Sequence, residues 1–230
     1  MEVEVIVQNG AEAMEAERLG ADRLELVSAI QEGGLTPSYG TIKQVLESVS
    51  IPVYIMVRPH SYHYSYQGSE MQIIQEDVKN ILQLGGNKIV FGSLNADLTI
   101  NEAQLASVIN ISKDLLITFH RAFDKTPSVI NAYRTLTAYH DQVKTILTSG
   151  GMSNCLVGKQ QLRELVTASR KHTGPQIMPG AGLSVENIEE IHQTVQASHY
   201  HFGKAVRVNQ SFQEGFAEDK WGQIRQIIQA

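Results

Sequence analysis

Four ionisable side chains stand within or beside short apolar runs of this 230-residue chain, where their types make chemistry possible. Glu25, Arg58 and His120 lie at or close to the end of such a run, and Glu4 lies near the start of another. A carboxylate and an imidazole can transfer protons near neutral pH, and a guanidinium can bind an anion. Whether they act together depends on the elements that carry them and on where each side chain points.

Short apolar runs typical of strands alternate with longer stretches of helical periodicity along the whole chain. The strands are predicted at residues 2–8, 22–27, 52–58, 88–92, 115–120, 144–149, 176–179 and 200–203. The helices are predicted at residues 11–19, 41–49, 71–84, 102–109, 128–139, 156–169, 185–195 and 221–228. Because parallel strands need a crossover between them, this alternation predicts an α/β fold, the (β/α)8 TIM barrel. The length fits a single domain over residues 1–230.

Alternation along each strand separates its side chains by face. In the first strand Val3, Val5 and Val7 are predicted to meet the helices, which turns Glu4 toward the barrel axis. The same parity in the other strands completes an inward-facing set of Glu4, Glu25, Arg58 and His120.

Charges inside a barrel cost desolvation energy unless they are paired or serve a ligand, and two interpretations follow. One is a buried ion-pair network in which Arg58 pairs with Glu25 or Glu4 and no chemistry takes place. The other is a functional site. Active sites of such barrels lie where the strands end, which favours a site for Glu25, Arg58 and His120 and a structural role for Glu4.

Composition narrows the class of protein. The net charge is −5 and no basic run is present, so nucleic acid is not expected as a partner. No apolar stretch approaches the roughly 18 residues of a membrane span, and residues 1–9 are not expected to act as a signal peptide. The single cysteine, Cys155, excludes an internal disulfide and fits a reducing cytoplasm.

Six segments, in this order along the chain, resemble the CutC family. They are ADRLEL at 21–26, EGGLTPS at 32–38, MVRP at 56–59, LITFHRAFD at 116–124, ILTSGG at 146–151 and IMPGAG at 177–182. The resemblance implies a cytoplasmic β/α barrel that often forms a homo-oligomer and has a role in copper tolerance and copper binding. The resemblance implies no particular reaction, so the sequence does not decide whether the protein is an enzyme.

The chain departs from the family pattern where a metal would matter. The cysteine common after Leu-Glu-Leu in the family is here Val27, and the family's Glu-His-small-Ser-Ala run is represented by YHFGKA at 200–205. Because Cu⁺ prefers thiolate and thioether ligands, this weakens a copper site. Cys155 and His201 remain candidate ligands, although a buried or half-buried thiol that acts as a small hydrophobe is the favoured explanation of Cys155. If Glu25, His120 and His201 converge, they could instead bind zinc, manganese or iron.

The loops that follow the last three strands carry the residues of a predicted anion site. Loops after strands seven and eight bind phosphate in many such barrels, through backbone N–H groups. Simple turn formation is the alternative explanation of the glycines. The candidates are Thr148, Ser149, Gly150, Gly180, Gly182, Gly203 and Lys204. The loop after strand three, with His60 and His63, is either a wall of the pocket or a plain surface or subunit-contact loop.

The leading hypothesis is an enzyme that acts on a small anionic molecule. Glu25 would be the general base and His120 a general acid or base, while Arg58 and Arg121 bind the anion and Asp124 orients a neighbour. The second hypothesis is a copper-binding or copper-trafficking protein without catalysis. The third is an oligomeric scaffold.

Overall fold

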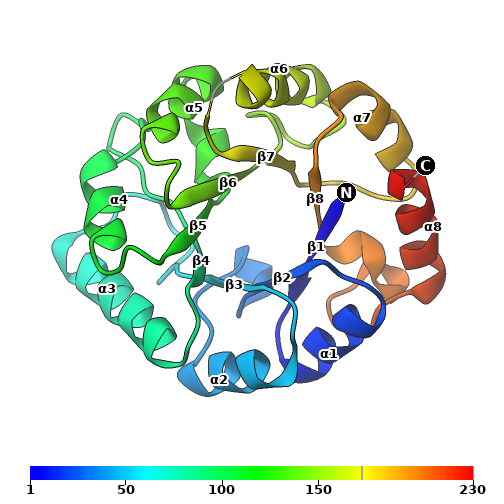
Figure 1. The fold of residues 1–230 in the computed structure, drawn as a ribbon, viewed down its shortest axis with the longest axis horizontal. Helices are drawn as coiled ribbons and strands as arrows, with labels where there is room; N and C mark the ends of the chain where they lie inside the picture. The colour runs from blue at the N-terminus through cyan, green and yellow to red at the C-terminus, as the bar shows by residue number, and fades with distance from the viewer. Residues whose placement is uncertain (172, 230) are drawn as a thin grey trace.

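The computed structural model describes residues 1–171 and 173–229, and these form a closed (β/α)8 TIM barrel as one domain. All strand pairs are parallel, in the order β7-β6-β5-β4-β3-β2-β1-β8, and a bridge between Gly180 and His201 closes the ring. Helices surround the strands on all sides (Figure 1). The predicted fold class is therefore confirmed.

The strands of the described residues are short, and one helix follows each of them. The strands are β1 (Glu2–Val7), β2 (Arg23–Leu26), β3 (Val53–Met56), β4 (Lys88–Phe91), β5 (Leu116–Phe119), β6 (Val143–Thr148), β7 (Gln176–Pro179) and β8 (His199–Phe202). The helices are α1 (Gly10–Arg18), α2 (Tyr39–Ser48), α3 (Gly68–Gln83), α4 (Glu102–Ile109), α5 (Val129–Thr137), α6 (Lys159–Lys171), α7 (Ile188–Val195) and α8 (Glu218–Gln229). Within the described ranges, none of these helices is long and apolar enough to cross a membrane.

Side-chain caps explain where several helices begin. Asn9, Ser38, Asn101 and Ser128 each accept a hydrogen bond from the backbone N–H three residues further on, at the start of α1, α2, α4 and α5. Such caps satisfy N–H groups that the first turn of a helix leaves without partners. The short polar residue before each helical pattern therefore sets the boundary.

Element ends differ from the predicted ones at a few informative positions. The last strand was predicted from residue 200, but His199 is the first residue of β8, and its ring lies 2.8 Å from a carboxylate oxygen of Glu2. The last helix before β8 was expected from residue 185 and begins at Ile188. The reason is a turn in which Asn187 Oδ1 accepts from the backbone N–H of Ser184 at 2.9 Å.

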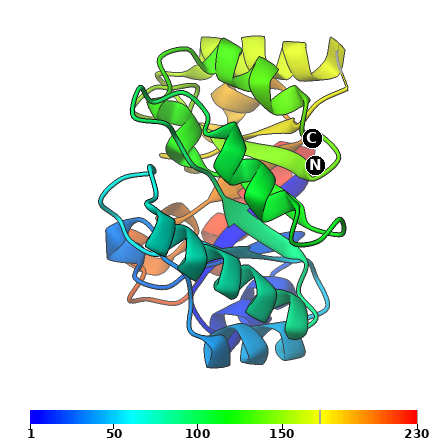
Figure 2. The same ribbon diagram turned by 90° about the vertical axis from the view of Figure 1, so that its left-hand side faces the viewer.

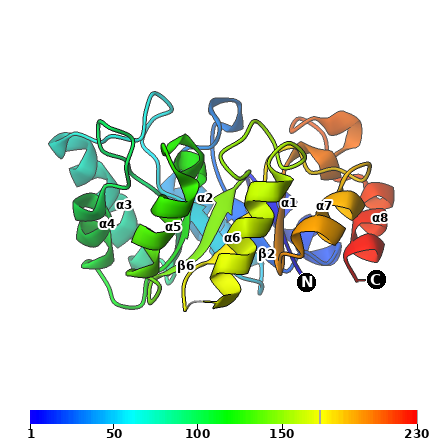
Figure 3. The same cartoon turned by 90° about the horizontal axis from the view of Figure 1, so that it is seen from above.

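The predicted alternation of faces holds in the packing. Val3, Val5 and Val7 are buried in the large core between strands and helices. Inside the barrel a smaller apolar cluster contains Val27, Tyr54, Met56 and Val90. Figures 2 and 3 show the helices packed around the strands, with the N-terminus at the lower edge of Figure 3 and the loops that follow the strands at its upper edge.

A buried ion pair joins the neighbouring strands β1 and β2. Arg23 Nε donates to Glu4 Oε2 at 2.5 Å, and Arg23 Nη2 donates to Thr118 Oγ1 at 2.8 Å. The guanidinium also lies over the ring of Tyr54, 3.5 Å from its centroid. The prediction that Arg58 pairs with Glu25 or Glu4 is therefore wrong, because the cation paired with Glu4 is Arg23. Strand register explains this, because Arg23 is the direct partner of Glu4 across β1 and β2.

We expect the Arg23→Met substitution to lower the free energy of unfolding by about 3–5 kcal/mol, because it leaves the carboxylate of Glu4 buried without its guanidinium. Urea unfolding followed by circular dichroism measures this. Arg23→Met combined with Glu4→Gln should recover at least half of the loss, since the buried charge is then gone. Lys79→Met, which breaks an exposed pair with Glu76, serves as control and should have no measurable effect. A single variant as stable as this control would contradict the assignment.

Candidate functional site

A cavity of about 550 Å³ opens at the C-terminal ends of the strands. Glu25, Arg58 and His120, predicted from parity to face inward near the strand ends, all line it. His201 from the end of β8 lies beside them. The structure thus brings the main candidates to one cavity, at the end of the barrel where active sites of this fold lie.

His201 lies between two buried carboxylates. Its Nδ1 is 2.7 Å from Glu4 Oε1, and its Nε2 is 3.8 Å from Glu25 Oε2. Glu4 and His201 are direct partners across β1 and β8, just as Glu4 and Arg23 are across β1 and β2. The row Arg23–Glu4–His201 therefore runs across three neighbouring strands and ends beside Glu25.

Burial and neighbouring charges shift the pKa values in this row in different directions. Burial by itself raises the pKa of Glu4, but Arg23 and His201 outweigh it and lower the value to about 2. Burial is the largest cause for Glu25, whose pKa is raised to about 7. For His201, burial opposes the charge, but Glu25 and Glu4 prevail and the pKa is raised. Near neutral pH, Glu4 is a fixed anion, and Glu25 can take up or release a proton.

Glu25 is also incompletely paired. Its Oε1 is buried and has no hydrogen-bond partner among the described residues. A buried acceptor without a partner is costly, and such positions are often explained by a ligand or by catalysis. This oxygen is the predicted general base, and its raised pKa fits that role.

His120 is held as a neutral ring. Burial first, and then the charge of Arg58, lower its pKa to about 3. The backbone N–H of Ala122 donates to His120 Nδ1 at 3.3 Å, which assigns the ring proton to Nε2. Nε2 is buried and has no partner within the described ranges. This geometry favours a hydrogen-bond donor toward a ligand over the predicted acid–base role. Gly92 leaves the ring its space, since a Cβ there would stand 2.7 Å from Nδ1.

Arg58 was predicted to bind an anion, yet most of its guanidinium contacts the protein itself. Nη1 donates to the carbonyl oxygens of Glu32, Gly33 and Gly34 at 3.3–3.4 Å, and Nη2 donates to that of Ser61 at 3.2 Å. Arg58 therefore ties the loop after β2 to the loop after β3. Its Nε is buried and unpaired as far as the structure describes the chain. That single N–H and the positive charge are what Arg58 offers to the cavity.

Asp124 occupies part of the predicted anion site. Its carboxylate accepts hydrogen bonds from the hydroxyl of Thr148, from the hydroxyl and N–H of Ser149, and from the N–H of Gly151. The N–H of Gly150 donates to Thr148 Oγ1 at 2.8 Å. The loop after β6 thus binds a carboxylate of this chain, and its donors are not directed to the cavity.

Asp124 also holds Arg121, in agreement with the expectation that it orients a neighbour. Arg121 Nε donates to Asp124 Oδ2 at 2.8 Å, and Nη2 donates to Ser149 Oγ at 3.1 Å. The side chain of Arg121 is 41% exposed and lines the cavity, so part of its charge faces a ligand. Arg121 was predicted to bind the anion, and it lies in the 3₁₀ turn Arg121–Lys125 that follows β5.

The remaining anion candidates divide between the cavity and the barrel wall. Gly182, Gly203 and Lys204 line the cavity. Gly180 instead donates its N–H to the carbonyl of Thr148 at 3.0 Å. A Cβ on Gly180 would lie 2.4 Å from Leu147 Cδ1, so a larger residue there would force the side chain of Leu147 to move.

Comparison with known proteins gives the family. The model of the CutC family matches residues 1–205. The chain belongs to the CutC family. A CutC family protein of Photorhabdus laumondii is 41% identical over 178 residues, which are 77% of this chain and 70% of that protein. The human copper homeostasis protein cutC homolog is 35% identical over 199 residues, which are 86% and 71% of the two chains.

Solved structures agree with the fold. A crystal structure of CutC from Streptococcus agalactiae has a TM-score of 0.80 and 26% identity, covering 88% of this chain and 98% of that one. Phosphoribosylanthranilate isomerase from Thermotoga maritima has a TM-score of 0.66 at 11% identity and covers 100% and 98%. The second likeness is one of fold alone.

The residues present do not fit a Cu⁺ site of the thiolate kind. Cys155 is fully buried, and burial raises the pKa of its thiol to about 12, so the thiol keeps its proton. It belongs to neither of the groups of potential ligands found in the described ranges, and Val27, where the resemblance led us to expect cysteine, is a buried apolar residue. Cu⁺ prefers soft sulfur ligands, and the thioether of Met56 is the single sulfur ligand among the residues that line this cavity.

The lowered pKa of His120 predicts an effect of acid on stability. The unfolded chain takes up a proton at this residue near pH 6.5, whereas the folded chain does so only near pH 3. Between these values the unfolded state binds more protons, so the contribution of His120 to stability falls as the pH falls. We expect His120→Asn to lose less stability than the parent chain between about pH 7.5 and about pH 5, measured by urea unfolding.

His140→Asn is the matched control for this experiment, because His140 is partly exposed beside Asp141 and contributes no comparable burial. The titration of Glu25 is common to all three proteins and cancels in the comparison. Equal losses in His120→Asn and in the parent chain would contradict a ring held neutral by burial.

Proposed function

We propose that this protein is an enzyme that performs acid–base chemistry on a small anionic molecule bound in the cavity. The observation that carries the proposal is the buried carboxylate of Glu25. Its pKa is raised to about 7, its Oε1 has no partner among the described residues, and His201 lies 3.8 Å from its other oxygen. A carboxylate poised near neutral pH is suited to accept and return a proton.

The proton transfer follows from the charged row. Glu25 Oε1 accepts a proton from the substrate, and protonated His201 stabilises the carboxylate before the transfer. Glu4 stays ionised because Arg23 and His201 lower its pKa, and this fixed anion keeps the His201 ring charged and oriented. Arg23 holds Glu4 in turn. Glu25 is thus the catalytic residue, and Glu4 and Arg23 are positioning residues.

Cations and hydrogen-bond donors around Glu25 support an anionic substrate. Arg121 is oriented by Asp124, and Lys204 is exposed at the mouth of the cavity. His120 Nε2–H and Arg58 Nε–H supply donors inside. Such donors can stabilise negative charge that develops on the substrate when its proton leaves. Gly182 and Gly203 also line the cavity. A cytoplasmic homo-oligomer is part of this proposal and rests on the resemblance to the CutC family.

Deuterium incorporation tests the proposed chemistry without knowledge of the substrate. The protein is incubated in D₂O with a mixture of small anionic metabolites, and mass spectrometry follows conversion or a gain of deuterium. We expect the parent chain to change at least one anionic compound and Glu25→Gln to slow this at least about 100-fold, as for loss of a general base.

Glu164→Gln controls for the removal of a charge, since Glu164 is exposed on α6 away from this cavity, and it should behave as the parent chain. Circular dichroism confirms that both variants fold. The proposal fails if the parent chain changes no compound, or if Glu25→Gln retains the parental rate.

The alternative function is copper binding or trafficking without catalysis, and it rests on the copper homeostasis named for the human relative. Titration with Cu⁺ under reducing conditions, against a chromogenic chelator, measures it. Because Cys155 is buried and protonated, we expect only weak binding, unchanged in Cys155→Ala. Tight binding of one Cu⁺ per chain that is lost in Cys155→Ala would favour the copper function and count against the enzyme.

A further inference from the structure

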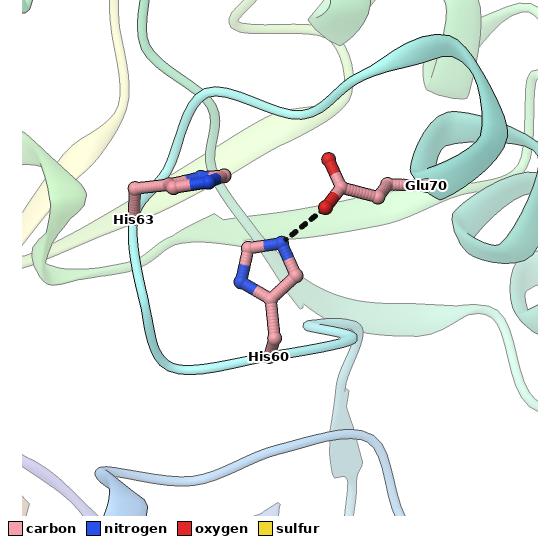
Figure 4. Close-up of side chains that lie close together, drawn as sticks. All are labelled: His60, His63 and Glu70. Atoms are coloured by element: carbon pink, nitrogen blue, oxygen red, sulfur yellow. Dashed lines mark hydrogen bonds and ion pairs between the residues drawn. The ribbon is translucent and has the colours of Figure 1, made fainter.

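Outside the cavity, His60, His63 and Glu70 come together at the loop after β3 (Figure 4). One potential ligand atom of each residue lies within 4.8 Å of those of the other two. His60 Nε2 is 2.9 Å from Glu70 Oε1, and the two imidazole rings lie 4.6 Å apart between centroids at 79°. In Figure 4 both rings and the carboxylate converge on the space between the loop and the start of α3.

The carboxylate of Glu70 is held by the start of α3. Its Oε2 accepts from the backbone N–H of Gln67 at 2.5 Å, as part of a capping box. This bond leaves Oε1 directed at His60. Hydrogen bonds of this kind orient the side chains that bind the ion directly in metal sites. The helix cap therefore prepares the carboxylate for a ligand role.

The ring of His60 is packed in place. Tyr62 stacks on it with centroids 5.1 Å apart, and Tyr66 lies 5.5 Å away. The side chain is only 12% exposed, and its Nδ1 is buried with no hydrogen-bond partner in the described part of the chain. The side chain of His63 is exposed to solvent. One largely buried imidazole, one exposed imidazole and one oriented carboxylate are thus side by side.

We propose that His60, His63 and Glu70 form a binding site for a divalent transition-metal ion of the zinc class. Two imidazoles and one carboxylate, with water in the fourth position, form a known zinc ligand set. Bonds of about 2.0–2.1 Å place tetrahedral ligand atoms about 3.3 Å apart, so the cluster needs to contract by at most about 1.5 Å. The exposed side of His63 gives an ion its way in and leaves room for the water.

The other group of potential ligands, Glu4, Glu25 and His201, is less suited to a cation. The guanidinium of Arg23 already lies 2.5 Å from Glu4, and the raised pKa of His201 means that a proton competes for its ring. No Arg or Lys forms an ion pair with Glu70 within the described ranges. Electrostatics therefore favours a metal at His60, His63 and Glu70.

A metal here would act on the wall of the proposed catalytic cavity. Ser61, between the two histidines, accepts a hydrogen bond from Arg58, and the ring of Tyr64, the next residue after His63, lies 4.9 Å from the guanidinium. Arg58 and Tyr64 both line the cavity. An ion that fixes His60 and His63 fixes this loop as well. The site stands on its own geometry and does not depend on the proposed enzyme activity.

Calorimetric titration of the full chain with Zn²⁺ tests the site, with the visible absorption of Co²⁺ as a second readout of tetrahedral coordination. We expect one Zn²⁺ per chain, with affinity at least tenfold weaker in His63→Ala and in Glu70→Gln. Glutamine preserves the capping hydrogen bond at this helix position, so Glu70→Gln tests the ligand and not the fold.

His140→Ala is the matched control, since this partly exposed histidine also lies beside a carboxylate, and it should bind Zn²⁺ as the parent chain does. Glu25→Gln should do the same. Absence of binding, unchanged binding in His63→Ala and Glu70→Gln, or loss of binding in Glu25→Gln would each overturn the proposal.

Discussion

The buried carboxylate of Glu4 is held between a cation on each neighbouring strand, Arg23 on β2 and His201 on β8. Burying a carboxylate at the centre of a barrel costs much desolvation energy, which only close opposite charges offset. Because Glu4 stays ionised, His201 keeps its proton and Arg23 stays fixed over Tyr54. The protonation state of Glu25, on the neighbouring strand β2, depends on the charge of His201. The charge of one strand thus sets the chemistry available at the mouth of the cavity.

Hydrogen bonds within the protein satisfy many of the polar and charged groups that could have bound a ligand. Arg58 is largely satisfied by carbonyl oxygens, and Asp124 takes the hydroxyls and N–H groups of the loop after β6. What is left for a ligand is specific: Glu25 Oε1, His120 Nε2 and Arg58 Nε, all buried and without partners in the described ranges. An acceptor and two donors on residues that line one cavity are suited to moving a proton while stabilising negative charge.

Copper and proton transfer make opposite demands on a site. Cu⁺ prefers thiolate and thioether ligands, whereas burial keeps the thiol of Cys155 protonated. Proton transfer needs oxygen and nitrogen groups with pKa values near neutrality, and Glu25 meets that demand. The cluster of His60, His63 and Glu70 is separate from both, since its borderline ligands suit Zn²⁺ and its loop reaches the cavity only through Arg58 and Tyr64.

The sequence by itself determined the barrel, because strand and helix periodicities are local properties that each segment carries alone. Parity, also local, correctly turned Glu25, Arg58 and His120 toward the inside. Only the tertiary structure decided which charges meet. Arg23 and His201 reach Glu4 through strand register and barrel closure, across 19 and 197 residues of chain. Asp124 fills the predicted anion loop across 25 residues. Such pairings depend on distances through space, which no local pattern encodes.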